Sequence, residues 1–193
     1  MDDDHEYIDD ENESGHSGLP PGLKRQKEFI NRVWPQIYAS EDSILFGMRR
    51  DNVNIHTMHP QPHHIFRLWQ IYLDNVDPLL KITHTPSLQA SIIDAVSNLS
   101  NISDSLEALM FSIYCVAITS LTDTQCQELF GTIKKHLLIG YHFACQQALL
   151  NCGVLNTSDY DCLVAFYLYL VCDLLWMQEF FALTSIDLYE TCH

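Results

Sequence analysis

The clearest structural signal in this chain is the proline-punctuated stretch His59-Pro-Gln-Pro-His-His-Ile-Phe-Arg-Leu-Trp-Gln-Ile-Tyr-Leu-Asp-Asn-Val-Asp-Pro-Leu-Leu-Lys-Ile-Thr-His-Thr-Pro86. Its bulky apolar residues recur at helical spacing, which predicts one buried face: Ile65, Leu68, Trp69, Tyr72 and Val76. Pro62 suits the first turn of a helix, where its missing N–H has no partner in any case. Pro78 cannot continue that helix, and Thr85-Pro86 is typical of an N-cap followed by a first-turn proline. The stretch therefore predicts a helix, a bent connector and a second helix that ends near Asn98.

Two further helices are predicted from their capping residues. Ser103 is a suitable N-cap for a helix from Asp104 to about Leu121, and this helix is apolar nearly all round, which predicts a central position. Thr122-Asp-Thr-Gln125 has the spacing of a capping box and begins the next helix, which Gly131 ends.

The last two helices are predicted from their apolar stripes. One stripe consists of Ile133, Leu137, Tyr141, Ala144 and Ala148, with Lys134 and Lys135 on the outer face and a helix end at Asn151-Cys-Gly153. Ser158-Asp-Tyr-Asp161 has capping-box spacing, and it opens a helix whose predicted buried face is Leu163, Phe166, Tyr167 and Leu170. No segment has the period of a strand, so the sequence predicts an all-α fold in which consecutive helices pack as antiparallel pairs.

Composition limits what this chain can do. Its net charge is −15 with only 10 Lys and Arg residues, which argues against nucleic-acid binding by the chain alone. The longest uncharged run, Ala108 to Thr122, is shorter than the roughly 20 residues of a membrane helix, so no membrane association is expected. The seven cysteines are expected to be reduced and buried, and none has zinc-finger spacing. Asp and Glu dominate the first 13 residues, which predicts a disordered acidic tail.

Several residues are possible sites by their chemistry. His56, His59, His63 and His64 could suggest a metal cluster, but their spacing matches no known site and they are better explained as turn and helix-start residues. His84 is interpreted as a hydrogen-bonded residue of the connector, and Cys145 and Cys152 as packing residues. We therefore predict no catalytic, cofactor-binding, metal-binding or DNA-binding residues in this chain.

The acidic tail leaves one enzymatic alternative. Asp9 and Asp10 with the following acids fit the loose pattern that holds magnesium and diphosphate in helical isoprenoid enzymes. Their flanks of Gly, Ser and Pro favour a solvated tail instead. A small magnesium-dependent isoprenoid enzyme and an unrelated helical adaptor therefore remain the alternatives to a non-enzymatic regulator.

The order of these features resembles the middle, regulatory region of fungal binuclear zinc-cluster transcription factors, of the type found beside secondary-metabolism gene clusters. The residues that carry the resemblance are His59-Pro-Gln-Pro62, Leu68 to Pro86, Ser105 to Leu121, Cys126 with Leu129-Phe-Gly131, Leu137-Leu138, Tyr141, Ala148-Leu149 and the last helix to Leu170-Val171. The resemblance implies an α-helical regulatory half-domain over residues 45–171, preceded by an acidic tail and linker over residues 1–44. It also implies a nuclear protein, otherwise a cytoplasmic one, that acts on transcription through protein partners such as a full-length transcription factor.

The sequence departs from the family pattern at two places, and both change the function that is expected. The family's six-cysteine module, which holds zinc and reads DNA, is missing because the first cysteine is Cys115. After Val171 the basic stretch of the family is replaced by residues 172–193, which contain no Lys or Arg. We therefore expect a truncated regulator that acts through protein contacts or is inactive, and that does not bind DNA by itself, with zinc implied only for the absent module.

Overall fold

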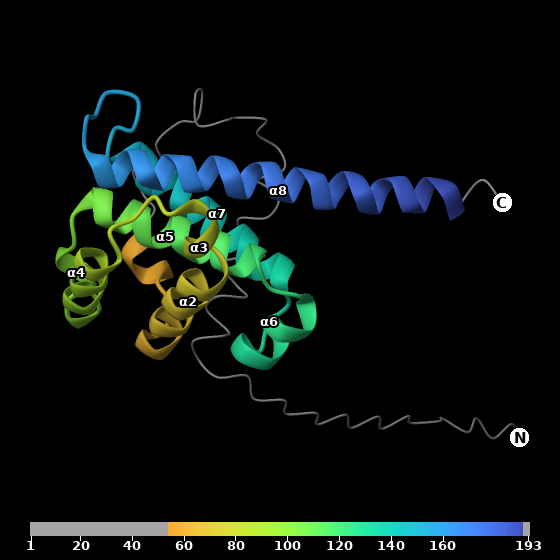
Figure 1. The fold of residues 1–193 in the computed structure, drawn as a ribbon, viewed down its shortest axis with the longest axis horizontal. Coiled ribbons are helices and arrows are strands. Elements are labelled where there is room, and N and C mark those ends of the chain that lie inside the picture. The colour runs from red at the N-terminus through yellow and green to blue at the C-terminus, as the bar shows by residue number, and fades with distance from the viewer. Residues whose placement is uncertain (1–53, 191–193) are drawn as a thin grey trace, which may run out of the picture.

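The computed structural model describes residues 54–190, and it describes the side chains of residues 54–175. Over this part of the chain every regular element is a helix (Figure 1), which confirms the predicted all-α fold. In chain order these are the 3₁₀ helix η1 (Ile55–Met58), α2 (Pro62–Asn75), α3 (Asp77–Leu80), α4 (Thr85–Ser97), the 3₁₀ helix η2 (Leu99–Asn101), α5 (Asp104–Thr119), α6 (Asp123–Phe130), α7 (Lys134–Asn151) and α8 (Tyr160–Glu190). The acidic tail predicted over residues 1–44 lies outside the described residues.

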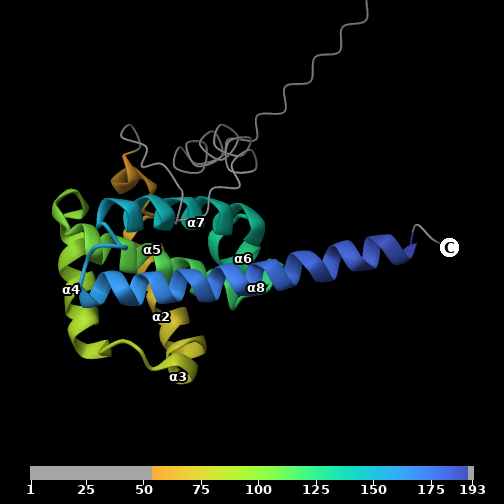
Figure 2. The same cartoon turned by 90° about the horizontal axis from the view of Figure 1, so that it is seen from above.

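Helix α5 is the centre of the fold. Every residue from Glu107 to Ile118 is buried, as the predicted all-round apolar pattern requires. Its main neighbours are α7, α8 and α2, and Figure 2 shows α7 and α8 running along α5 on different sides. Burying a side chain such as Phe111 contributes about 1.5–3 kcal/mol, so a helix buried on all sides dominates the packing.

The prolines shape the stretch that precedes α5. Pro62 lies in the first turn of α2, whose buried face includes Leu68, Trp69 and Tyr72. The connector contains the short helix α3, and Lys81 ends it in the left-handed conformation with φ 47°. The Tyr72 hydroxyl lies 3.2 Å from the Thr83 hydroxyl, which ties the connector back to α2. The predicted helix, bent connector and second helix are confirmed.

The helix starts agree with the predictions at two sites and differ by one residue at two others. The Ser103 hydroxyl accepts from the Leu106 N–H, and the capping box of Thr122 with Gln125 is present. The N-cap of α4 is His84 rather than Thr85, and His84 Nδ1 lies 2.7 Å from the Ser87 hydroxyl. At α8 the Asp159 carboxylate accepts from the Cys162 N–H at 3.1 Å. The predicted cap at Ser158 is therefore wrong by one residue, since an aspartate offers an equally good acceptor there.

Glycines mark the ends of helices α6 and α7. Gly131 follows α6 with φ 66°, and Gly153 lies just beyond α7 with φ 64°, a conformation that glycine adopts at little cost. Lys135 is exposed as predicted, but Lys134 is buried in the first turn of α7 beside Cys126, so the prediction that it lies on the outer face is wrong.

Helix α8 is the longest element and extends well past the other helices (Figure 1). Its first half packs on α5 and, less extensively, on α7. Among the residues that the structure describes, no helix combines the length and the apolar character needed to cross a membrane.

Candidate functional site

A buried polar cluster joins the start of the fold to the central helix. Glu107 lies in the first turn of α5, where a carboxylate complements the helix dipole, yet only 1% of its surface is exposed. Its Oε1 lies 2.7 Å from His56 Nδ1 and 3.3 Å from His59 Nε2. The other ring nitrogen of His59, Nδ1, lies 3.2 Å from the Tyr114 hydroxyl. A buried carboxyl group requires such partners because burial removes its hydration.

The ring of His59 is held on both its face and its edge. It stacks on Phe111 with a centroid distance of 4.4 Å and meets Tyr114 edge-on at 5.9 Å. Burial, followed by the neighbouring Tyr141 and Glu107, raises the pKa of the Tyr114 hydroxyl well above its usual range. Tyr114 therefore stays protonated and serves as a hydrogen-bonding group. The cluster fastens the segment around His56 and His59 to α5.

The four histidines that could suggest a metal cluster do not come together as one. His56 and His59 join Glu107, whereas His63 and His64 lie against each other with ring centroids 4.0 Å apart. His64 also meets Phe130 of α6 at 5.2 Å. Within residues 54–175 no group of three or more His, Cys, Asp or Glu side chains is arranged to hold a metal ion. Asp9 and Asp10 lie outside the described residues.

Three buried thiols meet where α5, α7 and α8 pack. They are Cys115, Cys145 and Cys172, and each is fully buried. Burial raises the pKa of Cys115 well above its usual range, and a hydrogen bond with Cys115, together with burial, raises that of Cys172. Because the thiolate is the reactive form, Cys115 and Cys172 are packing groups rather than nucleophiles, and Cys145 is buried beside them. This arrangement agrees with the sequence interpretation of Cys145.

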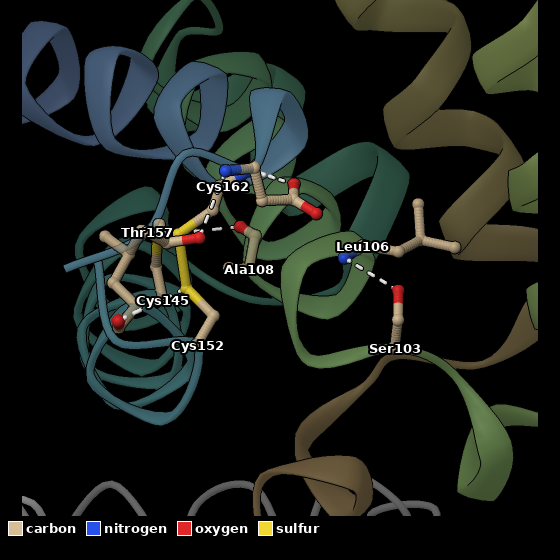
Figure 3. Close-up of a disulfide and its surroundings, with 9 residues drawn as sticks. Ser103, Leu106, Ala108, Cys145, Cys152, Thr157 and Cys162 are labelled. Carbon is tan, nitrogen blue, oxygen red and sulfur yellow. Dashed lines mark hydrogen bonds between the residues drawn. A yellow bond between two sulfur atoms is a disulfide. The ribbon is translucent and has the colours of Figure 1, made fainter.

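Cys152 and Cys162 are paired in a disulfide across the loop between α7 and α8 (Figure 3). Cys152 caps the end of α7, and Cys162 is buried in the first turn of α8. The expectation that the cysteines are reduced is wrong for this pair. Sequence spacing did not reveal it, because two helix ends meet only after the loop turns the chain back.

The outer surface of α8 differs from the sequence prediction. The face that packs on the bundle contains Cys162, Ala165, Leu168, Tyr169 and Cys172, all buried. Leu163, Tyr167 and Leu170, which the sequence predicted to be buried, are 42–46% exposed, and only Phe166 of that set is partly buried against the core. The buried face thus combines the small side chains of Cys162, Ala165 and Cys172 with the larger Leu168 and Tyr169, and the second apolar row of α8 is left outside.

We call the exposed apolar row the outer stripe of α8. It consists of Tyr160, Leu163, Tyr167, Leu170 and Leu174. An exposed apolar row of this length on a helix is typical of a surface that contacts another protein. The outer stripe and the cluster around Glu107 are the two features of the described residues that the core alone does not explain.

The chain is similar in sequence to several curated fungal proteins. It is 57% identical over 144 residues to "Transcriptional regulator AacuB" of Aspergillus aculeatus, a match that covers 74% of this chain and 20% of that protein. It is 37% identical over 146 residues to an aurofusarin cluster transcription factor of Gibberella zeae, covering 72% of this chain and 22% of that protein. A C6 finger domain transcription factor of Aspergillus niger is 39% identical over 107 residues, covering 54% of this chain and 14% of that protein.

This chain spans about a fifth of the length of the first two of these relatives. No protein-family model matches the sequence, and no solved structure matches it significantly.

Proposed function

We propose that this chain, which is homologous to one segment of fungal transcription regulators of secondary-metabolite gene clusters, is a regulatory segment that works through protein contacts rather than catalysis. The observation that carries the proposal is the 57% identity over 144 residues with a transcriptional regulator. Identity at this level over most of a chain supports a shared fold and a related role for the matched segment.

The features of the described residues fit a contact role. The side chains of Glu107 and His59 are buried, the Tyr114 hydroxyl stays protonated, and the thiols Cys115 and Cys172 are buried and protonated as well. The outer stripe of α8, in contrast, presents apolar side chains to solvent. The magnesium-dependent isoprenoid enzyme considered from the sequence finds no support among the named relatives, which are transcription regulators.

Two further parts of the proposal concern location and DNA. We place the protein in the nucleus, because transcription regulators act there. The chain by itself is proposed not to bind DNA, since a net charge of −15 opposes the neutralisation of phosphates on which such binding depends. Its effect on a promoter then depends on a protein partner, for example a full-length transcription factor.

A segment exchange tests this proposal. The homologous segment of the Aspergillus aculeatus regulator is replaced by residues 54–190 of this chain, and the transcripts that depend on that regulator are measured in its own host. We expect the chimera to restore these transcripts, whereas a regulator with the segment deleted does not. A chimera that accumulates in the cell yet gives transcript levels equal to the deletion would contradict the proposal.

A matched control separates function from folding. The same chimera carrying Ala108→Pro in the second turn of α5 interrupts the central helix, because proline removes a backbone hydrogen bond and clashes with the preceding turn. We expect this chimera to be inactive. Equal activity with and without the substitution would show that the folded segment is not needed.

A further inference from the structure

The disulfide between Cys152 and Cys162 lies at a junction that the fold also holds together by other means. At the end of α7 the Gly153 N–H donates to the carbonyl of Leu150 at 3.2 Å. On the far side of the loop the Asp159 carboxylate accepts from the Cys162 N–H, which caps α8. These hydrogen bonds fix the backbone beside both cysteines, and they do not depend on the bond between the two sulfur atoms.

The two bonded cysteines differ in their access to solvent. Of the six cysteines that the structure describes, five are 0% exposed, Cys162 among them, and Cys152 is partly exposed. The loop that follows Cys152 is open, and its Gly153, Leu155 and Asn156 are exposed (Figure 3). A small thiol in solution therefore reaches the bond from the side of Cys152, whereas the bundle covers the side of Cys162.

The fold also accommodates the two cysteines as free thiols. Cys152 Sγ lies 3.3 Å from the carbonyl oxygen of Leu149, so a thiol at this position has an acceptor already in place. Cys162 belongs to the apolar core, where a free thiol packs as a small apolar group. The bonded and the free forms of the pair thus fit the same backbone.

The cellular compartment decides what such a bond is for. Glutathione and thioredoxin keep thiols reduced in the nucleus and the cytosol, so the disulfides found there are usually transient and redox-sensing. The inference below rests on the proposed function in this one respect, because that function places the chain in the nucleus. A bond with an accessible sulfur and a fold that accepts both states suits exchange better than permanent cross-linking.

We propose that Cys152 and Cys162 form a site of reversible thiol–disulfide exchange with glutathione, in which Cys152 reacts with glutathione and Cys162 is its buried partner. In the oxidising direction the Cys152 thiolate attacks glutathione disulfide and releases one glutathione thiolate. The Cys162 thiolate then attacks the Cys152 sulfur of the mixed disulfide and releases the second. The two cysteines are oxidised, one glutathione disulfide is reduced to two glutathione molecules, and the two cysteine protons pass to the released thiolates. Reduction runs the same steps in reverse.

The state of the bond sets how firmly α8 is tied at its start. The Tyr160 hydroxyl donates to the carbonyl of Ile82 at 2.7 Å, so the first turn of α8 also contacts the connector before α4. Once the bond is broken, the non-covalent contacts alone hold this turn, and it opens more often. The rest of the first half of α8 stays packed on α5, so the fold persists in both states.

A matched pair of variants of the full chain tests which sulfur reacts. Cys162→Ser leaves Cys152 without its partner, and Cys152→Ser leaves the buried Cys162. Each folded variant is incubated with glutathione disulfide, and mass spectrometry measures the mixed disulfide at the remaining cysteine. We expect Cys152 to react at least about tenfold faster than Cys162, because exchange depends on access to the sulfur. Equal rates, or a faster reaction at Cys162, would overturn the assignment.

A glutathione titration tests reversibility without any substitution. The full chain is equilibrated in buffers that range from almost fully reduced to almost fully oxidised glutathione, then denatured and alkylated. Mass spectrometry gives the bonded fraction of Cys152 and Cys162, and Cys126 serves as the free cysteine that is alkylated throughout. We expect the bond to pass from broken to formed within the glutathione ratios that cells hold. A bond that survives the most reducing buffer, or never forms in the most oxidising one, would overturn the inference.

Hydrogen exchange of the oxidised and the reduced chain tests the structural consequence. We expect the amides of Cys162 and Leu163 to exchange about tenfold faster or more after reduction, while the amides of α5 keep their protection. Equal exchange at the start of α8 in both states would contradict the proposed loosening. These experiments read the chemistry of the purified chain and the segment exchange reads transcription, so a failure of this inference and a failure of the proposed function can be told apart.

Discussion

Glu107 shows how a single residue can hold a helical fold together. It lies in the first turn of α5, and its Oε1 lies beside two imidazoles of the segment before α2, hydrogen-bonded to His59 Nε2 at 3.3 Å and 2.7 Å from His56 Nδ1. The side chain of His59 is in turn fully buried between Phe111, Tyr114 and this carboxyl group. The prolines around His59 fix the backbone, and the cluster fixes where that backbone meets α5.

Removing the carboxyl group is expected to destabilise the fold. In Glu107→Ala the buried ring of His59 loses its carboxylate acceptor, which costs about 1–3 kcal/mol. Urea denaturation of the full chain at neutral pH measures this loss as a fall in the free energy of unfolding. Glu128→Gln, on the exposed side of α6, serves as the control and should change little. Equal stability of the two variants would contradict the assigned role of Glu107.

The stability of the fold is expected to depend on His64. Burial, and then the adjacent His63, lowers the pKa of His64 below its usual 6.5. The folded chain therefore favours the neutral ring, so the stability that His64 contributes is present above pH 6.5 and is lost as the pH falls toward the lowered pKa. In His64→Gln this part of the pH dependence should disappear, while His84→Gln at an exposed position should keep it. Thermal melts between about pH 7.5 and about pH 5 measure the difference. If the melting temperature falls in parallel with pH in the unsubstituted chain, His64→Gln and His84→Gln, the assignment is refuted.

At the scale of elements, α8 shows which faces can be read from a sequence. Apolar periodicity predicted the helix itself, but it assigned Leu163, Tyr167 and Leu170 to the buried face. Two apolar rows run along this helix, and the buried one contains the small side chains of Ala165, Cys162 and Cys172. Periodicity cannot choose between two apolar rows, because the choice depends on how closely the neighbouring helix can approach.

A pair of leucines on α8 tests this assignment directly. Leu168 is fully buried against the bundle, whereas Leu170 is 42% exposed on the outer stripe. We expect Leu168→Ala to lower the free energy of unfolding by about 2–5 kcal/mol, because it leaves a cavity. Leu170→Ala should cost much less, about 0.5 kcal/mol or below. Chemical denaturation measures both, and the opposite ranking would mean that the sequence prediction of the buried face was right.

The disulfide between Cys152 and Cys162 connects α7 to α8. A bridge that closes a loop of about ten residues stabilises a chain by about 3 kcal/mol in the loop-entropy model. We therefore expect a reductant to lower the melting temperature of the full chain. After denaturation, iodoacetamide should label Cys152 and Cys162 only if a reductant was added, while Cys126 should be labelled without it. Labelling of all three cysteines without a reductant would show that the bridge is absent.

At the scale of the whole molecule, the fold is a set of helices arranged around α5, and most of it could be predicted. The cap at Ser103, the capping box at Thr122 and the glycine at 131 act locally, so the sequence marks them. The contact of Glu107 with His56 and His59 joins residues about 50 positions apart, and no local pattern encodes it. The outer stripe of α8 was visible as apolar residues, but its exposure depends on the packing of the whole chain.

The homologous regulators are about five times longer than the segment that this chain matches. In the function proposed above, such a segment contacts other proteins or other parts of a regulator, and the outer stripe of α8 is an exposed apolar surface in the described residues on which we propose such a contact. The central claim is thus that this chain acts on transcription by binding a partner through α8.

One measurement tests that claim most directly. The chimera of the Aspergillus aculeatus regulator with residues 54–190 of this chain is compared with the same chimera carrying Leu170→Gln and Leu174→Gln, and with one carrying Leu79→Gln. The regulator-dependent transcripts are quantified at equal protein levels. We predict that the two substitutions in the outer stripe together reduce the transcripts to the level of the segment deletion, whereas the Leu79 variant remains fully active. Full activity of the chimera with both stripe substitutions would contradict the account.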